Sequence, residues 1–263
     1  MQKSIWAVSV LMIASQLGGC AENAGSHEQH SKQTGEIVGT DTSGHHHGGE
    51  NDQTPINCPM HNQSQQHQHG HNHKPFASTD EYIAHLDRSD RDQWQKPDEV
   101  VSALGLKGTE TLADIGAGSG YFSFRFAKVL TDGDVIALDI EPEMITHIQK
   151  RAIDEGVQNV IARLAKADDP SVPNSADWVF ICNVLHHIEN TEAWLTRLHN
   201  QLSPGAKVAI IEFKPGELPV GPPEWMKIAP EKVIEMLGAA GFSLSRQESD
   251  LLPYQDLFVF IRK

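Results

Sequence analysis

The sequence predicts an α/β protein with a doubly wound, mostly parallel seven-stranded sheet and helices on both faces, preceded by a disordered tether. Three observations predict this fold. Beyond about residue 97, short apolar runs alternate regularly with stretches of helical length. The runs are nearly continuously apolar, as expected of strands that are buried on both faces of a sheet. Regular alternation of this type is typical of parallel sheets with right-handed crossovers.

The elements follow in order from the start of the apolar pattern. Ser78 and Glu81 form a capping box that predicts a helix through Arg88. Pro97 suits the first turn of a second helix that reaches Leu104. Seven strands are then expected, at residues 111–115, 134–139, 159–164, 177–182, 206–213, 242–248 and 256–262. Four further helices are expected, at residues 120–130, 142–155, 191–202 and 231–240.

Composition divides the 263 residues into three parts, at residues 1–19, 20–75 and 76–263. Apolar residues are dense only in the last part, so we expect one sizeable core there. The formal net charge is −14, and Lys and Arg do not cluster. Because binding to a phosphate backbone needs clustered basic side chains, the sequence argues against a nucleic acid as the main partner.

Residues 1–19 are typical of a secretory signal peptide. Their apolar stretch is shorter than the roughly 20 residues of a transmembrane helix. Leu17-Gly18-Gly19-Cys20 resembles the bacterial lipobox, which implies that Cys20 is lipidated and becomes the mature N-terminus. We therefore expect a membrane anchor on the periplasmic or extracytoplasmic side. An ordinary signal peptide, or a cytoplasmic protein whose N-terminus happens to contain a cysteine, is the alternative.

Residues 20–75 are rich in Gly, Ser, Asn, Gln and His, so a flexible, disordered tether is expected. Ten of the fifteen histidines fall here, and imidazoles at this density bind late first-row divalent ions. Cys58-Pro59-Met60-His61 resembles the Cys-Pro-Met-His motif of small heavy-metal-binding modules. Thiolate, thioether and imidazole ligands suit Cu(I), so Cys58, Met60 and His61 are candidate ligands for Cu or Zn. A solvated spacer without a metal is the alternative.

The first expected strand runs directly into a glycine loop, Gly116-Ala-Gly118-Ser-Gly120, after which a helix is expected to open at Tyr121. Glycines let the backbone turn sharply and let a ligand approach closely, and a helix N-terminus offers unpaired N–H groups. A dinucleotide-binding loop is the alternative, but its fingerprint wants glycine at the position of Tyr121. Asp114 completes the pattern Asp-x-Gly-x-Gly-x-Gly.

At these positions, and over about residues 96 to 262, the chain resembles the class I S-adenosylmethionine-dependent methyltransferases, whose fold is Rossmann-like. The resemblance implies that the cofactor is held by Asp114, Gly116, Gly118, Gly120, Asp139, Asp168 and Asn183.

Further positions match the family in order along the chain. Asp139 ends the second expected strand, where an acid accepts hydrogen bonds from the ribose hydroxyls. Asp168 follows the third strand, where the family has an acid at the adenine amino group, and Asp169 is the rival for that role. Asn183 opens the segment that in the family lines the sulfonium end of the cofactor, and His186 and His187 lie in it.

Methyl transfer from a sulfonium needs a positioned nucleophile and the exclusion of water, and it needs a base only for some acceptors. His186 or His187 is the candidate base, and histidines with a purely structural role are the alternative. Acceptor determinants are expected in residues 82–94, in the loop after the fourth strand and in residues 214–226. The absence of an added substrate domain favours a small acceptor, and we expect a monomer.

The sequence thus supports two hypotheses. In the first, the chain is an S-adenosylmethionine-dependent methyltransferase that acts on a small acceptor. In the second, it is a lipid-anchored metal-binding protein with a non-catalytic domain of the methyltransferase fold. Supply of a cofactor made in the cytoplasm is the difficulty for the first hypothesis. The second must explain why every cofactor-contacting position is intact.

Overall fold

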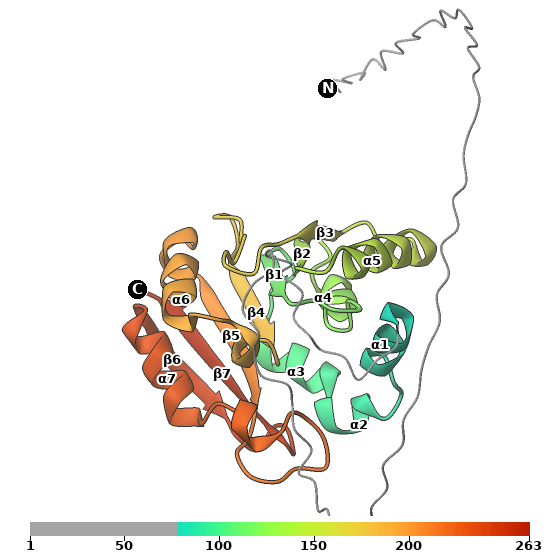
Figure 1. Cartoon of the computed structure of the whole chain (residues 1–263). Helices are drawn as coiled ribbons and strands as arrows, with labels where there is room; N and C mark the ends of the chain where they lie inside the picture. Colours follow the sequence, from blue (N-terminus) through green and yellow to red (C-terminus); the bar gives the residue numbers. More distant parts are fainter. Residues whose placement is uncertain (1–77) are drawn as a thin grey trace, which may run out of the picture. The chain divides into compact units, whose positions relative to one another are not determined.

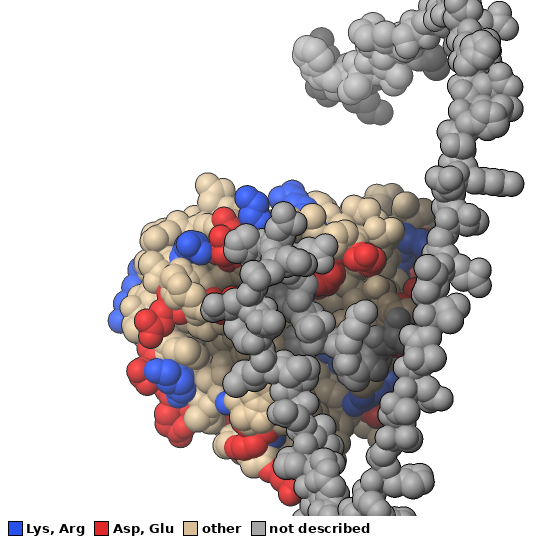
Figure 2. Space-filling model, in the orientation of Figure 1, with Lys and Arg blue, Asp and Glu red and all other residues tan. Residues whose placement is uncertain are grey.

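The computed structural model describes residues 78–263 (Figure 1). The predicted lipidation site at Cys20, the tether and the candidate metal ligands Cys58, Met60 and His61 lie outside the described residues and stay predictions. Within residues 78–263, no helix is both long and apolar enough to cross a bilayer. On the face that Figure 2 shows, acidic and basic side chains are interspersed.

The described residues form one seven-stranded sheet with the strand order β3-β2-β1-β4-β5-β7-β6. Strands β1 to β5 are parallel, and β7 runs antiparallel to both of its neighbours. The expected doubly wound, mostly parallel sheet is thereby confirmed. The strands are β1 (Thr111–Ile115), β2 (Asp134–Asp139), β3 (Val160–Leu164), β4 (Trp178–Cys182), β5 (Lys207–Phe213), β6 (Phe242–Glu248) and β7 (Gln255–Arg262).

Helices cover both faces of this sheet (Figure 1). They are α1 (Thr79–Leu86), α2 (Arg91–Gln95), α3 (Pro97–Leu104), α4 (Ser123–Val129), α5 (Pro142–Glu155), α6 (Thr191–Gln201) and α7 (Pro230–Ala239), with short 3-10 turns η1 (Leu185–His187) and η2 (Glu224–Met226). Apolar residues of α3, α4 and α5 pack in one core cluster with alternate residues of the central strands. The intervening strand residues pack with α6 and α7 in a second cluster. We call these the α4 face and the α6 face.

Two predicted helix boundaries differ from the structure by two residues or more, and the other differences are of a single residue. The helix expected to open at Tyr121 begins at Ser123, because residues 116–122 form turns. The helix from the predicted cap at Ser78 ends at Leu86 rather than Arg88. The cap itself is confirmed, since the Ser78 hydroxyl accepts a hydrogen bond from the Glu81 N–H at 3.2 Å.

The glycine loop is anchored to the core by the aromatic ring that follows it. The ring centroid of Phe122 lies 4.8 Å from that of Phe180 on β4, and Phe126 lies at the same distance from Phe180. All three rings are buried. Since Phe122 follows the loop directly, this packing holds the loop against the carboxyl ends of β1 and β4.

Candidate active site

Polar side chains gather at the edge where the parallel strands end. Asp114 is the last residue but one of β1, Asp139 ends β2 and Glu212 lies near the end of β5, and all three are buried. Because β7 is antiparallel to β5, its first residues, Gln255 and Asp256, lie at the same edge and are also buried. The sequence predicted the first two residues as site residues but missed the last three.

The glycine loop turns over the end of β2. The N–H groups of Gly116 and Ala117 both donate to the carbonyl of Leu138, at 2.8 and 3.0 Å. Gly116, Gly118 and Gly120 have φ values of 67°, 56° and 80°, which L side chains rarely adopt.

Space also excludes side chains from this loop. A Cβ on Gly116 would lie 2.3 Å from Cγ2 of Val184, and one on Gly120 would lie 2.8 Å from the ring of Phe124. At these two positions it is the close approach of protein side chains, together with positive φ, that demands glycine.

Asp139 is held by backbone donors. Its Oδ2 accepts from the Gly118 N–H at 2.8 Å, and its Oδ1 accepts from the Glu141 N–H at 3.0 Å. Burial raises the pKa of Asp139, and these two hydrogen bonds oppose that rise. Each carboxylate oxygen can accept a further hydrogen bond, so the side chain has capacity for two hydroxyl groups.

Asp114 is the most strongly perturbed carboxyl at this edge. The Ser123 hydroxyl donates to its Oδ2 at 2.5 Å. Burial raises the pKa of Asp114 to about 7, although the hydrogen bond from Ser123 lowers it. The charge on this carboxyl therefore changes near neutral pH.

Asp168 and Asp169, the two rivals for the adenine end, have different surroundings. Oδ1 of Asp169 accepts from the Ser171 N–H and from Nε2 of Gln201, both at 2.7 Å, and these bonds lower its pKa. The side chain of Asp168 is exposed, and its backbone carbonyl accepts from Arg197. Asp169 thus stabilises the turn after β3, whereas the carboxylate of Asp168 takes no part in these contacts.

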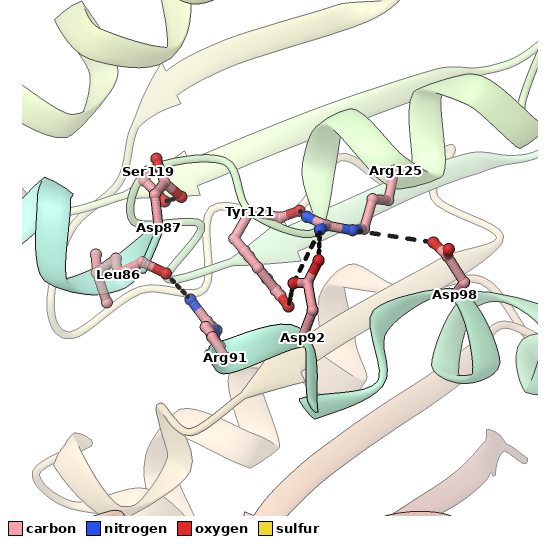
Figure 3. Close-up of polar contacts among 8 residues, drawn as sticks. All are labelled: Leu86, Asp87, Arg91, Asp92, Asp98, Ser119, Tyr121 and Arg125. Atoms are coloured by element: carbon pink, nitrogen blue, oxygen red, sulfur yellow. Dashed lines mark hydrogen bonds and ion pairs between the residues drawn. The ribbon is translucent and has the colours of Figure 1, made fainter. Parts of the chain in front are cut away.

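The leading helices are fastened to the glycine loop by polar contacts, which Figure 3 shows. The Tyr121 hydroxyl donates to Asp92 on α2, and Nη2 of Arg125 lies 3.1 Å from both Asp92 oxygens. The Ser119 hydroxyl donates to Asp87, which follows α1, at 2.6 Å. These contacts join α1 and α2 to the turn between β1 and α4.

Arg91 of α2 lies over the ring of Tyr121, with its Cζ 3.7 Å from the ring centroid. Its Nη1 donates to the carbonyl of Leu86 at 2.7 Å (Figure 3). Burial lowers the pKa of Arg91. On α1, Tyr82 lies near Asp139, since burial and the Asp139 charge together raise the Tyr82 pKa. Helix α1 therefore lies beside the end of β2.

A chain of amides links α2 to the loop after β4. Nε2 of Gln95 donates to Oε1 of Gln255 at 2.6 Å, and Nε2 of Gln255 donates to Oδ1 of Asn183 at 2.5 Å. Asn183 has a positive φ of 60°. Oε1 of Gln95 and Nε1 of Trp94 are buried and have no partner in the described part of the chain.

Cys182 lies beside this amide chain, with its Sγ 3.6 Å from Nε2 of Gln95. Burial raises the pKa of the Cys182 thiol, which keeps it neutral. The thiol packs with the core cluster of the α4 face.

His186 is paired with an acid that the sequence did not single out. Its Nδ1 lies 2.7 Å from Oε2 of Glu212, and the two side chains are only 3% and 2% exposed. The ring of His187 lies 4.0 Å from that of His186. A signal for Glu212 was present, because it is a single acid within an otherwise apolar strand.

A cavity of about 570 Å³ lies at the opposite edge of the sheet, where β2 and β3 begin, and Gly133, Asp134 and Asn159 line it. None of the predicted site residues lines this cavity, so it does not belong to the candidate site.

Comparison with known proteins agrees with this architecture. Residues 113–208 match the family model described as a methyltransferase domain. The aklanonic acid methyltransferase DauC of Streptomyces sp. strain C5 is 31% identical over 132 residues, which are 49% of this chain and 60% of that protein. The ubiquinone/menaquinone biosynthesis C-methyltransferase UbiE of Cellvibrio japonicus is 28% identical over 118 residues, 43% of this chain and 47% of that protein. The chain thus spans about half to three fifths of these curated relatives.

Among solved structures, a SAM-dependent methyltransferase from Aquifex aeolicus matches with a TM-score of 0.64 and 26% identity, over 69% of this chain and 97% of that one. The cyclase SpnF shares the fold at a TM-score of 0.54 and 15% identity, over 63% of this chain and 80% of its own. Residues 78–263 therefore have the Rossmann-like methyltransferase fold, and the match to the methyltransferase-domain model covers residues 113–208.

The raised pKa of Asp114 predicts a pH dependence of stability. Between about pH 4 and pH 7 the folded state holds a proton that the unfolded state has released, so stability falls as pH rises through this window. Asp114→Asn should remove this fall, whose slope reaches about 1.4 kcal/mol per pH unit. Urea unfolding from pH 4.5 to 8 measures it, with the exposed Asp250→Asn as control. If the free energy of unfolding changed with pH in the same way for wild type and Asp114→Asn, the raised pKa of Asp114 would be contradicted.

The contacts of Asp92 predict a local loss of order. Asp92→Ala leaves the hydroxyl of the buried Tyr121 without its acceptor, which should lower the free energy of unfolding by about 1–3 kcal/mol. Amide hydrogen exchange should quicken in residues 79–95 and stay unchanged where amides exchange by local opening elsewhere, as at the end of α7. Asp98→Ala is the matched control, because Asp98 is 93% exposed and its ion pair with Arg125 is long, at 4.0 Å. Unchanged exchange in residues 79–95 would show that Asp92 does not hold these helices.

Proposed function

We propose that the folded part of this chain transfers a methyl group from S-adenosylmethionine to a small acceptor. The observation that carries the proposal is the pair of buried carboxyls at the carboxyl edge of β1 and β2, Asp114 and Asp139, with the half-buried Arg91 nearby. In open α/β sheets, ligands bind at this edge, where the strand order reverses. In this sheet the order reverses at β1, between β2 and β4.

The nucleoside half of the cofactor fits the end of β2. Asp139 keeps acceptor capacity for ribose hydroxyls, since each carboxylate oxygen has two acceptor sites and the bonds from Gly118 and Glu141 occupy one on each oxygen. The exposed carboxylate of Asp168 follows β3, where the family resemblance implies an acid at the adenine amino group. The loop from Gly116 to Gly120 lies at this edge, and its Gly118 N–H donates to Asp139. Together these features favour a nucleoside with a free ribose.

The amino-acid half of S-adenosylmethionine is a zwitterion, and the site offers one group for each charge. Asp114 is a buried acid whose pKa the positive charge of Arg91 lowers, so the two lie within electrostatic reach of each other. The guanidinium of Arg91 donates one observed hydrogen bond to Leu86 and has further donors for a carboxylate. We assign the cofactor's amino group to Asp114 and its carboxylate to Arg91.

The bound cofactor supplies an activated methyl group on its sulfonium. The chain has to orient the acceptor beside that group and exclude water. Asn183, fixed by Gln255 and by its own strained backbone, faces the same edge and suits the sulfonium end. His186 or His187, two residues of η1, would accept the acceptor's proton where one must be removed.

Calorimetric titration of the full-length chain tests the cofactor assignment. Wild type should bind S-adenosylmethionine, and Arg91→Met should weaken binding by roughly 10- to 100-fold, since a hydrogen bond to a charged group is lost. Arg91→Lys keeps the charge but not the paired donors, so its affinity should lie between those of wild type and Arg91→Met. Arg163→Met, at an exposed site on β3, is the control. A folded wild type that binds no S-adenosylmethionine would contradict the proposal, and the hypothesis of a non-catalytic domain would remain.

We also propose that Cys20 anchors the chain to a membrane outside the cytoplasm. Support comes from the apolar stretch and the Leu-Gly-Gly-Cys sequence that ends at Cys20. Metabolic labelling with a radioactive fatty acid should mark the wild-type protein and the Cys58→Ala control, and should fail in Cys20→Ala. Equal labelling of Cys20→Ala would refute the anchor.

A further inference from the structure

Glu212 has one carboxylate oxygen that nothing in the described chain satisfies. Its Oε2 pairs with Nδ1 of His186 at 2.7 Å, but its Oε1 is buried and has no hydrogen-bond partner among residues 78–263. Leaving a buried carboxylate oxygen without a donor costs free energy. A buried oxygen without a partner at the edge where ligands bind indicates that a bound ligand supplies the hydrogen-bond donor.

A second buried acid lies beside Glu212 on the same face of the sheet. Asp256 on β7 is directly opposite Glu212 in the antiparallel register and is 4% exposed. Residues directly opposite in an antiparallel pair project from the same face of the sheet. Two neighbouring carboxylates repel each other and any further anion, and His186 can balance at most one of their charges. This arrangement favours a cation.

The position of the pair separates it from the cofactor groups. Ile210 on β5 and Phe258 on β7, each two residues from the acids, pack in the cluster of the α6 face. Because side chains alternate along a strand, Glu212 and Asp256 project toward that face. Leu112, two residues before Asp114, packs on the α4 face, so the cofactor acid Asp114 projects the other way.

We propose that Glu212 and Asp256 form the subsite for a protonated amine of the methyl acceptor, with Oε1 of Glu212 as the hydrogen-bond acceptor. The proposal rests on the proposed function and names the substrate class of that site. His186 holds Glu212 in place through Oε2, which leaves Oε1 for the ligand. The subsite recognises the amine; carboxylates and uncharged hydroxyl compounds lack the charge that it balances. An acceptor of this class is held through its ammonium group, whereas an acceptor without an amine is held only around its reacting carbon.

Three benzene derivatives of similar size test the charge preference. The full-length chain is titrated calorimetrically with benzylamine, benzyl alcohol and benzoate, with and without S-adenosylhomocysteine. Benzylamine should bind at least about 10-fold more tightly than benzyl alcohol, and benzoate should bind most weakly. Equal affinity for the three compounds, or no binding of benzylamine at millimolar concentration, would overturn the proposal.

Variants then identify the groups responsible. Glu212→Gln removes the charge at nearly constant volume and should weaken benzylamine binding by roughly 10- to 100-fold, while Asp256→Asn should weaken it less. Glu99→Gln, at an exposed position on α3 outside the segments expected to bind the acceptor, should have no effect. Unaltered benzylamine affinity in Glu212→Gln would refute the assignment.

The outcomes distinguish this inference from the proposed function. Unchanged affinity of Glu212→Gln for S-adenosylhomocysteine shows that the variant is folded and that its cofactor half is intact. If wild type binds benzylamine through Glu212 but binds no S-adenosylmethionine, the proposed function fails and the amine subsite stands. If S-adenosylmethionine binds and the benzylamine result is negative, the subsite alone fails.

Discussion

The reversal of strand order at β1 is the constraint on which the site depends. β1 lies between β2 and β4, so the connections that leave β1 and β4 run toward opposite faces of the sheet. The first residues of these two connections therefore diverge at the carboxyl edge of the sheet. The glycine loop satisfies its own N–H groups there, on the Leu138 carbonyl and on Asp139. Positive φ at Gly116 and the nearby Val184 side chain allow no other residue to make that turn.

Burial of polar groups at this edge follows from the same arrangement. Strands that are covered on both faces end among apolar side chains, so a carboxyl at a strand end is desolvated. Asp114 shows the consequence in a pKa raised to about 7, and Glu212 shows it in an oxygen without a partner. The apolar clusters of the α4 face and the α6 face offset this cost in free energy, because they bury nearly every large hydrophobic residue of the sheet. Groups held at such a cost are candidates for ligand binding.

Local patterns in the sequence predicted most of the fold, because apolar runs and capping residues are local signals. The bounds of β1, β2, β6, α3 and α5 agree with the prediction to the residue. Pairings between distant segments carry no such signal. The contact of Gln95 with Gln255 joins residues 160 positions apart, and the position of Asp256 opposite Glu212 depends on where β7 enters the sheet. Helix α2 is five residues long, too short for a helical period to show.

This division between local and distant signals explains why the cofactor can be inferred more readily than the acceptor. Asp114, the glycine loop and Asp139 occupy one continuous stretch of the chain, and the matched family model spans this region. The proposed amine subsite instead combines η1, β5 and β7, and β7 lies beyond residue 208, where that match ends. Glu212 and Asp114 project toward opposite faces, so cofactor and acceptor would approach the sheet edge from its two sides. Asn183 follows β4 between them and, through Gln255, is tied to the strand that carries Asp256. Substitutions at Glu212 or Asp256 would then leave Asp114 and Asp139 in place, whereas a substitution at Gln255 would also disturb Asn183.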